Sequence, residues 1–156
     1  MIEVDHPEEL RPFVGQELGV SQWRSLSLED LRDFGAITGD EHWIHTDPER
    51  AAREAPYGGV IAHGFLLLSL VIGMAQEVYA VRGAKSWLNY GLDKVRFTNP
   101  VTLADALRLR VALVELEQQP RGGTRLKLAL TLEIEGKPRP ALVADWISIA
   151  YTGDGA

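Results

Sequence analysis

The feature that most constrains the fold of this chain is an apolar run from Phe65 to Ala75, which only Ser69 and Gly73 interrupt. The residues around it, from His63 to about Tyr79, favour one long helix. The first three turns of that helix are apolar on every face, so it needs cover on more than one side. The run is too short to cross a bilayer, which takes roughly 20 apolar residues. We therefore expect a buried helix and no membrane span.

The second half of the chain has the period of β-strands. Strand-like residues fill four segments: Ser86–Pro100, Leu107–Leu113, Arg125–Glu135 and Leu142–Tyr151. In Arg125–Glu135, apolar and polar side chains alternate throughout, which places one face on a core and the other on solvent. Earlier in the chain, Val14–Arg24 alternates more loosely, and residues 1–12 form an arm or a capping segment. An antiparallel sheet curved around the apolar helix would cover it, so we predict an α+β fold.

Local signals predict two shorter helices ahead of the apolar one. Ser27 is a helix N-cap residue, and Gly39 is a stop for a helix whose apolar residues recur at regular intervals. Asp47 caps a second helix, because a proline follows it directly, and this helix runs to about Glu54. Residues 40–46 are an irregular loop between the two helices, and this loop is dense in titratable side chains.

Composition bounds the class of protein. With 156 residues, 46% of them hydrophobic and 24% charged, the chain can bury a core and is not disordered. We predict a single domain over residues 1–156, with its core at about residues 15–151. The net charge is −6, and no run of lysine or arginine has the character of a nucleic-acid footprint. We therefore predict no nucleic-acid partner.

The chain has no cysteine, which excludes disulfides, thiolate metal ligands and a cysteine nucleophile. That composition fits a reducing compartment. Residues 1–9 lack the basic and apolar regions of a signal peptide. We expect a cytoplasmic protein.

Asp40 and His45 are close in the loop, so a carboxylate and an imidazole come together without long-range folding. A carboxylate accepts hydrogen bonds, and a neutral imidazole offers one donor and one acceptor. Together the two side chains are suited to hold a single water, remove its proton and pass a proton back. The alternative is that an aspartate after a glycine at a helix end only forms the turn.

Gly64 and His63 stand where the apolar helix begins. The first amides of a helix have no partner within it, so the Gly64 amide is suited to stabilise charge on a substrate carbonyl oxygen. The alternative is that glycine is only small enough for a crowded helix–sheet contact. For His63 we favour a structural role over direct chemistry, as a buried histidine bonded to a loop carbonyl.

A metal site is a further alternative, because His42 and His45 have the spacing H-x-x-H, with Asp40, Asp47 and His63 near them in the sequence. Mononuclear sites do combine histidine with carboxylate. The two histidines lie in a loop, however, and no H-E-x-x-H motif is present. The chain also lacks a G-x-S-x-G elbow, a P-loop and a dinucleotide motif. We therefore assign no metal and no cofactor, and take water as the nucleophile.

Two segments together resemble the signature of the MaoC-like dehydratases, which include the (R)-specific enoyl-CoA hydratases, also called hydratase 2. These segments are Thr38–Asp47 (TGDEHWIHTD) and Gly59–Leu66 (GVIAHGFL). Phe97–Val101 and Ala104–Asp105 resemble the strand-opening segment that comes next in the same family, and the resemblance covers roughly residues 15–150. The branch it is most similar to contains the nodulation protein N-like members.

The resemblance implies a hot-dog fold, in which a curved antiparallel sheet wraps a long helix, usually in a homodimer. It implies reversible hydration of a trans-2-enoyl-CoA to the (R)-3-hydroxyacyl-CoA in fatty acid metabolism. Asp40 and His45 match the catalytic dyad of the family, and Gly64 matches its oxyanion-hole amide. Within the dyad we assign Asp40 as the principal base and His45 as the partner that orients the water and acts as the acid.

One departure from the family concerns the shape of the pocket. Many of its hydratases have Asn-Pro where this chain has His42-Trp43. We expect Trp43 and Ile44 to lie at the substrate-binding site, with Trp43 shortening the acyl tunnel or forming part of its wall. The nucleotide end of coenzyme A needs cations, and the candidates are Lys85, Lys94, Arg96 and Arg121.

Two other functions fit the same sequence. A thioesterase on the same fold would also bind acyl-CoA and would also use a carboxylate with water. A non-catalytic module would bind the acyl thioester without turning it over. The Asp40–His45 loop and the His63–Gly64 helix start favour hydration.

Overall fold

The computed structural model describes residues 1–120 and 122–153. The elements in chain order are β1 (Ile2–Val4), the 3-10 helix η1 (Pro7–Phe13), β2 (Gln16–Val20), β3 (Arg24–Ser25), α1 (Leu28–Thr38), α2 (Trp43–Thr46), α3 (Pro48–Glu54), α4 (Gly64–Ala75), β4 (Tyr79–Val81), β5 (Ser86–Phe97), β6 (Ala106–Gln118), β7 (Thr124–Ile134) and β8 (Leu142–Tyr151). Helices come mainly before residue 76 and long strands after it, as the change of period predicts.

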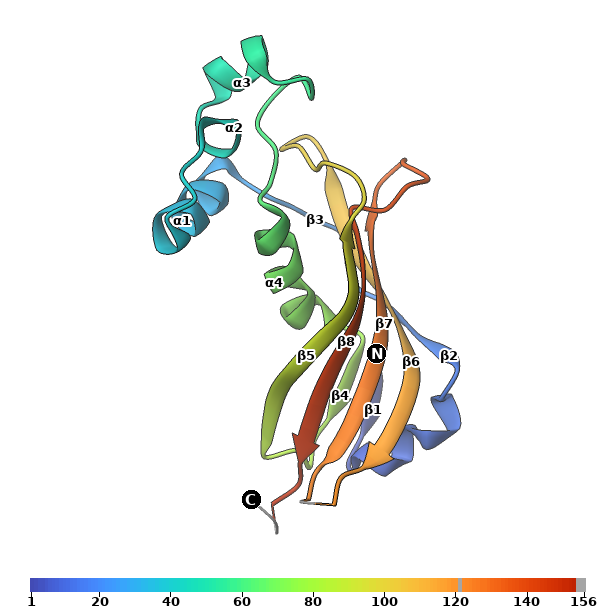
Figure 1. Ribbon diagram of the computed structural model, residues 1–156. Coiled ribbons are helices and arrows are strands. Elements are labelled where there is room, and N and C mark those ends of the chain that lie inside the picture. The colour runs from blue at the N-terminus through green and yellow to red at the C-terminus, as the bar shows by residue number, and fades with distance from the viewer. Residues whose placement is uncertain (121, 154–156) are drawn as a thin grey trace.

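The long strands form one antiparallel sheet in the order β2-β6-β7-β8-β5, with the short β3 also paired to β6. The strands are strongly curved, and α4 lies along one face of the sheet (Figure 1). The helices α1, α2 and α3 project beyond the sheet near the start of α4 (Figure 1). A long helix against a curved antiparallel sheet is the α+β hot-dog fold that we predicted.

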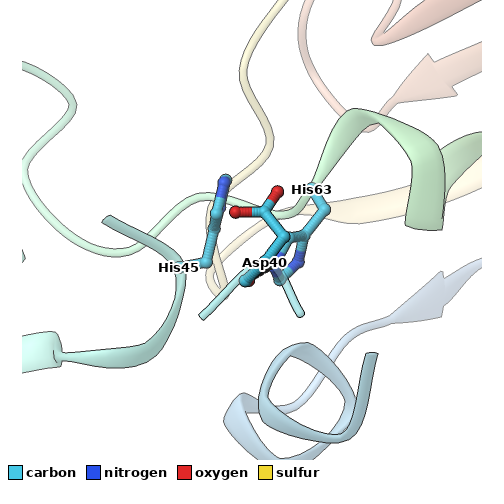
Figure 2. Close-up of side chains that lie close together, drawn as sticks. All are labelled: Asp40, His45 and His63. Atoms are coloured by element: carbon cyan, nitrogen blue, oxygen red, sulfur yellow. Dashed lines mark hydrogen bonds between the residues drawn. The ribbon is translucent and has the colours of Figure 1, made fainter. Parts of the chain in front are cut away.

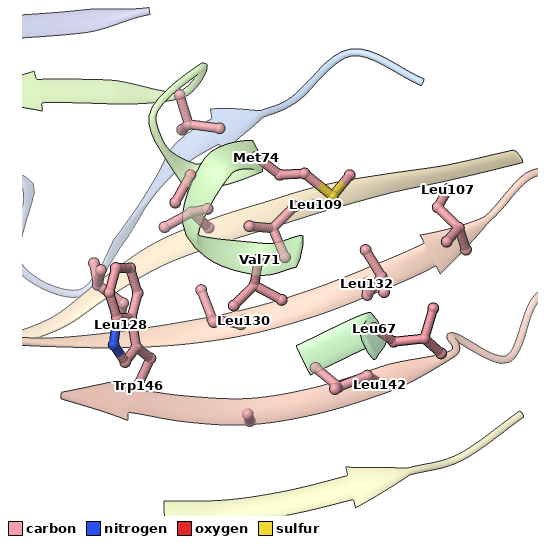
Figure 3. Close-up of a cluster of buried hydrophobic side chains, with 14 of the residues drawn as sticks. Leu67, Val71, Met74, Leu107, Leu109, Leu128, Leu130, Leu132, Leu142 and Trp146 are labelled. Atoms are coloured by element: carbon pink, nitrogen blue, oxygen red, sulfur yellow. The ribbon is translucent and has the colours of Figure 1, made fainter. Parts of the chain in front are cut away.

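The core lies between α4 and the inner face of the sheet (Figure 3). Along β7, buried and half-buried residues alternate strictly, and every leucine from Leu126 to Leu132 is on the buried face, which confirms the alternation predicted for Arg125–Glu135. Helix α4 contributes Leu67, Val71 and Met74 to this core. Burial of apolar surface on one face of each element is what holds the helix to the sheet.

Helix α4 is shorter than we predicted. It ends at Ala75, and residues Tyr79–Val81 form β4, which pairs in parallel with β1. The prediction of a helix to Tyr79 was wrong because Tyr79–Val81 has a strand partner 77 residues earlier in the chain. The amino-terminal arm is thus partly a strand, which pairs with the segment after α4.

The cover of α4 is also incomplete in the single chain. Phe65, Ser69 and Gly73 share a face of the helix that is exposed, and the Phe65 side chain is 69% accessible. The sheet therefore covers one side of an all-apolar helix and leaves the other side to solvent. We expected cover on more than one side, and the described part of a single chain does not supply it.

The predicted caps are confirmed. Ser27 and Asp47 each accept a hydrogen bond from a backbone amide in the first turn of the helix that they precede. Gly39 ends α1 in the left-handed conformation with φ at 78°. The loop of residues 40–46 is less irregular than predicted, because its second half forms the single-turn helix α2.

Candidate active site

Asp40 directly follows the left-handed Gly39 that ends α1, so the turn carries its side chain away from the helix. Asp40 is exposed, and no described residue donates a hydrogen bond to its carboxylate. Its backbone carbonyl, in contrast, accepts a hydrogen bond from the ring of His63 at 2.9 Å. The main chain of Asp40 is held by the protein, and its carboxylate is left to bind something else.

His45 lies in α2, where its ring reaches the segment that precedes α4. Its Nδ1 is 2.6 Å from the carbonyl oxygen of Ile61. A carbonyl oxygen only accepts, so Nδ1 carries the proton and Nε2 presents a lone pair. Burial lowers the pKa of His45 and outweighs the opposing effect of the Ile61 hydrogen bond. The neutral, accepting form is therefore favoured at neutral pH.

His63 brings the loop and the helix together. Its side chain is buried, and its ring stacks on that of His45 with centroids 3.8 Å apart and planes 27° from parallel. One donor atom from each of Asp40, His45 and His63 lies within 4.8 Å of the others. Figure 2 shows the three side chains grouped at the junction between the loop of residues 40–46 and α4.

The same three side chains would have to converge if they held a metal ion. The lone pair of an imidazole nitrogen lies in the plane of its ring, and stacked rings direct their lone pairs side by side rather than at one point. One nitrogen of each ring is also bonded to a carbonyl oxygen. As placed, the residues do not fit a shared tetrahedral ion. The geometry fits a carboxylate–imidazole water site better.

Gly64 is the first residue of α4, after the N-cap His63. The side chain of His63 makes no capping hydrogen bond, whereas α1, α2 and α3 each have a side-chain cap. The first amides of α4 thus keep the partial positive charge of a helix start. A Cβ on Gly64 would lie only 3.0 Å from the Phe97 ring, so a larger residue would need this ring to move.

A cavity of about 320 Å³, the catalytic cavity, opens beside these groups. It is lined by residues from the segments that carry the site and from the end of β5: His45, Tyr57, Ile61, Ala62, Gly64, Leu67, Phe97, Thr98, Asn99, Pro100 and Val101. Sequence reasoning did not assign Tyr57 or residues 97–101 to the site. The only signal for the latter was their family resemblance, because nothing local indicates that β5 ends against Gly64.

Two more cavities follow the groove between α4 and β5. One of about 240 Å³ is lined by Leu68, Val71 and Ile72 of the helix and by Asn89 and Leu92 of the strand, among others. The next, of about 380 Å³, lies at the end of α4, and Trp146 and Ile72 line both. The three cavities therefore follow α4 from Gly64 to its last turn.

Trp43 and Ile44 are not among the residues that line the catalytic cavity. Trp43 packs under the guanidinium of Arg50, 4.5 Å from its ring centroid. The carbonyl of Ile44 accepts a hydrogen bond from the Ile61 amide at 3.0 Å, so Ile44 helps to join the loop to the segment before α4. Their role in substrate binding remains a prediction.

The four candidate cations are scattered. Arg96 precedes the cavity residue Phe97, and Lys94 pairs with Asp145. Lys85 is bonded through its main chain to Tyr151, at the opposite end of β5. Arg121 lies outside the described residues. Only Arg96 is adjacent in sequence to a residue of the catalytic cavity.

Comparison with known proteins agrees with this geometry. Residues 10–134 match the model of the MaoC like domain. The 3-hydroxyacyl-thioester dehydratase Z of Mycobacterium tuberculosis (strain ATCC 25618 / H37Rv) is 40% identical over 89% of this chain and 91% of that protein. Nodulation protein N of Rhizobium leguminosarum bv. viciae is 45% identical over 87% of this chain and 85% of that protein.

A solved structure is similar as well. The R-hydratase PhaJ1 of Pseudomonas aeruginosa superposes with a TM-score of 0.70 and 26% identity, over 88% of this chain and 81% of that one. The chain therefore belongs to the MaoC-like dehydratase family, in the hot-dog fold. Within the described part of the chain, no helix is long and apolar enough to cross a membrane.

Proposed function

We propose that this protein is a hydro-lyase that catalyses the reversible hydration of a trans-2-enoyl-CoA to the (R)-3-hydroxyacyl-CoA. One observation carries the proposal: a carboxylate with no donor among the described residues, an imidazole whose Nε2 is an acceptor, and a helix start without a side-chain cap lie at one site. Relatives named as a 3-hydroxyacyl-thioester dehydratase and an R-hydratase support the same chemistry. We further propose a cytoplasmic protein whose whole length, residues 1–156, is one domain.

In this proposal the thioester carbonyl of the substrate points at the start of α4. Its oxygen accepts a hydrogen bond from the amide of Gly64. When water attacks C3, the π electrons move toward the carbonyl and an enolate develops. The amide and the helix dipole stabilise the charge that forms there, which is the step in which stabilisation raises the rate.

The attacking water donates one hydrogen to the carboxylate of Asp40 and the other to Nε2 of His45. His45 takes the proton as the oxygen bonds to C3, and the imidazolium returns that proton to C2 on the same face. Its tautomer and lowered pKa support this order, because neutral His45 has no Nε2 proton to give at the start. This division differs from the one that sequence suggested, in which Asp40 was the principal base.

The acyl chain extends from the Gly64 end of the groove between α4 and β5 toward Trp146. The three successive cavities along that groove support this path. Helix α4 spans residues 64–75, which corresponds to about 18 Å at 1.5 Å per residue. A groove of this length suits medium or long acyl chains.

The active form is a homodimer in this proposal. Strand β5 pairs only with β8 among the described strands, so one of its edges is free. Most of its residues are exposed on both faces, and the adjacent face of α4 exposes Phe65. A long, apolar free edge is otherwise a site of aggregation, and pairing with a second β5 would remove it.

Crotonyl-CoA provides the test. We expect enoyl absorbance to fall without release of free thiol, and the product to be the (R)-3-hydroxy isomer. Asp40→Asn and His45→Gln should each lower kcat by about 10²–10⁴, the usual contribution of an acid–base group. Release of free thiol would indicate a thioesterase. No turnover of any enoyl-CoA, with binding retained in both variants, would indicate a non-catalytic module.

A further inference from the structure

We infer that His63 is a positioning residue that holds Asp40 and His45 in register with each other and with the start of α4. The inference rests on the proposed hydratase function. His63 uses two separate parts of one ring: its Nε2–H binds the main chain of Asp40, and its face supports the ring of His45.

The ring edge fixes Asp40. Because the carbonyl oxygen of Asp40 only accepts, the nitrogen 2.9 Å from it donates, and His63 carries its proton on Nε2. The carbonyl of Asp40 also lies close to α1. A Cβ on Gly35 would lie 2.9 Å from the oxygen and 3.6 Å from Nε2, so the bond needs a glycine there. Since the carboxylate shares its residue with that carbonyl, its direction depends on this bond.

The ring face fixes His45. Two contacts hold that imidazole: the 2.6 Å hydrogen bond from Nδ1 to Ile61 and the stack on His63 at 3.8 Å. A rotation of the His45 ring about its Cβ–Cγ bond would break both contacts together. Either contact alone would leave the His45 ring free to move in a direction that the other contact prevents. The direction of Nε2, which must meet the water, is therefore set jointly by Ile61 and His63.

His63 is itself rigid and does not act on the substrate. The amides of Ile61 and Ala62 donate to the carbonyls of Ile44 and Val101 at 3.0 and 2.8 Å, which clamps the segment before α4 on both sides. The side chain of His63 is 2% exposed, and it does not line the catalytic cavity. Its Nδ1 is buried and has no hydrogen-bond partner among the described residues. These features suit a support that transmits position, not a proton donor to solvent.

Two substitutions separate the two contacts. His63→Phe keeps an aromatic face for His45 and loses the N–H to Asp40, whereas His63→Gln keeps an N–H donor and loses the face. We expect each to lower kcat by roughly 10- to 100-fold with KM changed less than about threefold, because the dyad is displaced and the cavity is not. Gly35→Ala leaves His63 in place but displaces the Asp40 carbonyl, and it should lower kcat in the same way. His6→Gln, at the cap of η1, is the matched histidine control and should leave kcat and KM unchanged.

Kinetics referred to the amount of folded protein distinguish positioning from mere stability. A variant that only unfolds more easily would lose active molecules, and its kcat per folded molecule would be unchanged. A variant in which Asp40 and His45 are displaced should have a lower kcat per folded molecule. If kcat per folded molecule is unchanged in both His63 variants, the inference is overturned.

Imidazole ¹⁵N–¹H NMR tests the same contact without any substrate. The wild-type spectrum should show His45 as a single Nδ1–H tautomer. His63→Phe should retain it, and His63→Gln should show exchange between tautomers. If the wild type hydrates no enoyl-CoA, the proposed function fails, but the spectra still decide the inference. A single unchanged His45 tautomer in His63→Gln would contradict it.

Discussion

The carbonyl of Ile61 determines what His45 can do. By binding Nδ1–H it leaves Nε2 as an acceptor, and burial favours the uncharged ring. Asp40 differs, because its carboxylate is exposed and has no hydrogen-bond donor among the described residues. Two titratable side chains with different surroundings can therefore have different roles around one water.

The first prediction concerns pH. Because the pKa of His45 lies below the usual histidine value of 6.5, the accepting form persists to lower pH in the folded protein. The acid limb of kcat/KM for crotonyl-CoA should therefore have its midpoint below 6.5.

The linkage to stability has a definite sign. The unfolded chain takes up a proton at His45 at a higher pH than the folded one does. Stability from this residue is therefore lost as the pH falls through the unfolded pKa toward the folded one. Urea titrations between pH 7.5 and 5.5 would measure the slope. An acid limb above 6.5 in the wild type would contradict the prediction.

The second prediction concerns Gly64. Gly64→Ala should lower kcat/KM by roughly tenfold, since its Cβ would lie 3.0 Å from the Phe97 ring and something must shift. The double variant Gly64→Ala/Phe97→Leu makes room, so it should recover part of the loss relative to Phe97→Leu alone. If the double variant recovers nothing, contact with Phe97 is not the cause.

At the scale of elements, β5 is an edge strand that a single chain leaves largely exposed. It is twelve residues long, and all of its residues except Gly91 and Val95 are exposed. It ends at Phe97, which packs against Gly64 and Phe65. The strand that presents a free edge thus also lines the catalytic cavity, so the proposed dimer contact and the proposed active site involve one element.

The third prediction tests that edge. Tyr90→Lys places a charge on a side chain that is 64% exposed in the single chain, so folding should be unaffected. If a second β5 covers it, the variant should become monomeric by light scattering, with an unchanged circular dichroism spectrum. Val114→Lys, a similar change on the exposed side of β6, should stay dimeric. A wild-type protein that is monomeric would contradict the proposal.

At the scale of the whole molecule, one layer of apolar side chains joins α4 to the sheet. Figure 3 shows Leu67, Val71 and Met74 of the helix over Leu109, Leu130 and Leu132 of the strands. These contacts hold α4, which begins at Gly64, against β6 and β7. A loss of packing in this layer would therefore also move the start of α4.

The fourth prediction measures that layer. Leu130→Ala removes a side chain that is 2% exposed in the centre of β7, and it should lower the free energy of unfolding by about 2–5 kcal/mol. Urea denaturation would measure the change. Thr131→Ala, on the half-buried outer face of the same strand, is the control and should cost much less. Equal losses would show that the inner face is not the main source of stability.

Features that depend on neighbouring residues could be predicted from the sequence. The caps at Ser27, Gly39 and Asp47 were predicted because a cap is decided within one helical turn. The alternation of β7 was predicted because it has a period of two residues. Asp40, His45 and Gly64 fall within one short stretch with a specific family signature, so they could be selected as candidates before any fold was known.

Features that depend on distant segments required the tertiary structure. Helix α4 ends at Ala75 because Tyr79–Val81, which follows it closely, pairs with β1 as a strand. The wall made by Phe97 and Asn99 comes from the end of β5 and the segment that follows it, where no local pattern indicates a site. The position of Trp43 outside the cavity lining follows from its packing on Arg50.

His63 lies between these two cases. From the sequence, a structural histidine at the helix start was the favoured interpretation. Only the fold revealed that its ring contacts both Asp40 and His45, because stacking and hydrogen-bond angles depend on how the loop folds back on the helix. The sequence by itself determined the helix caps, the alternation of the strands and the candidate site residues, because each of these depends on neighbouring positions in the chain. The tertiary structure decided which of those residues meet, because contact between distant segments is settled by packing of the whole core.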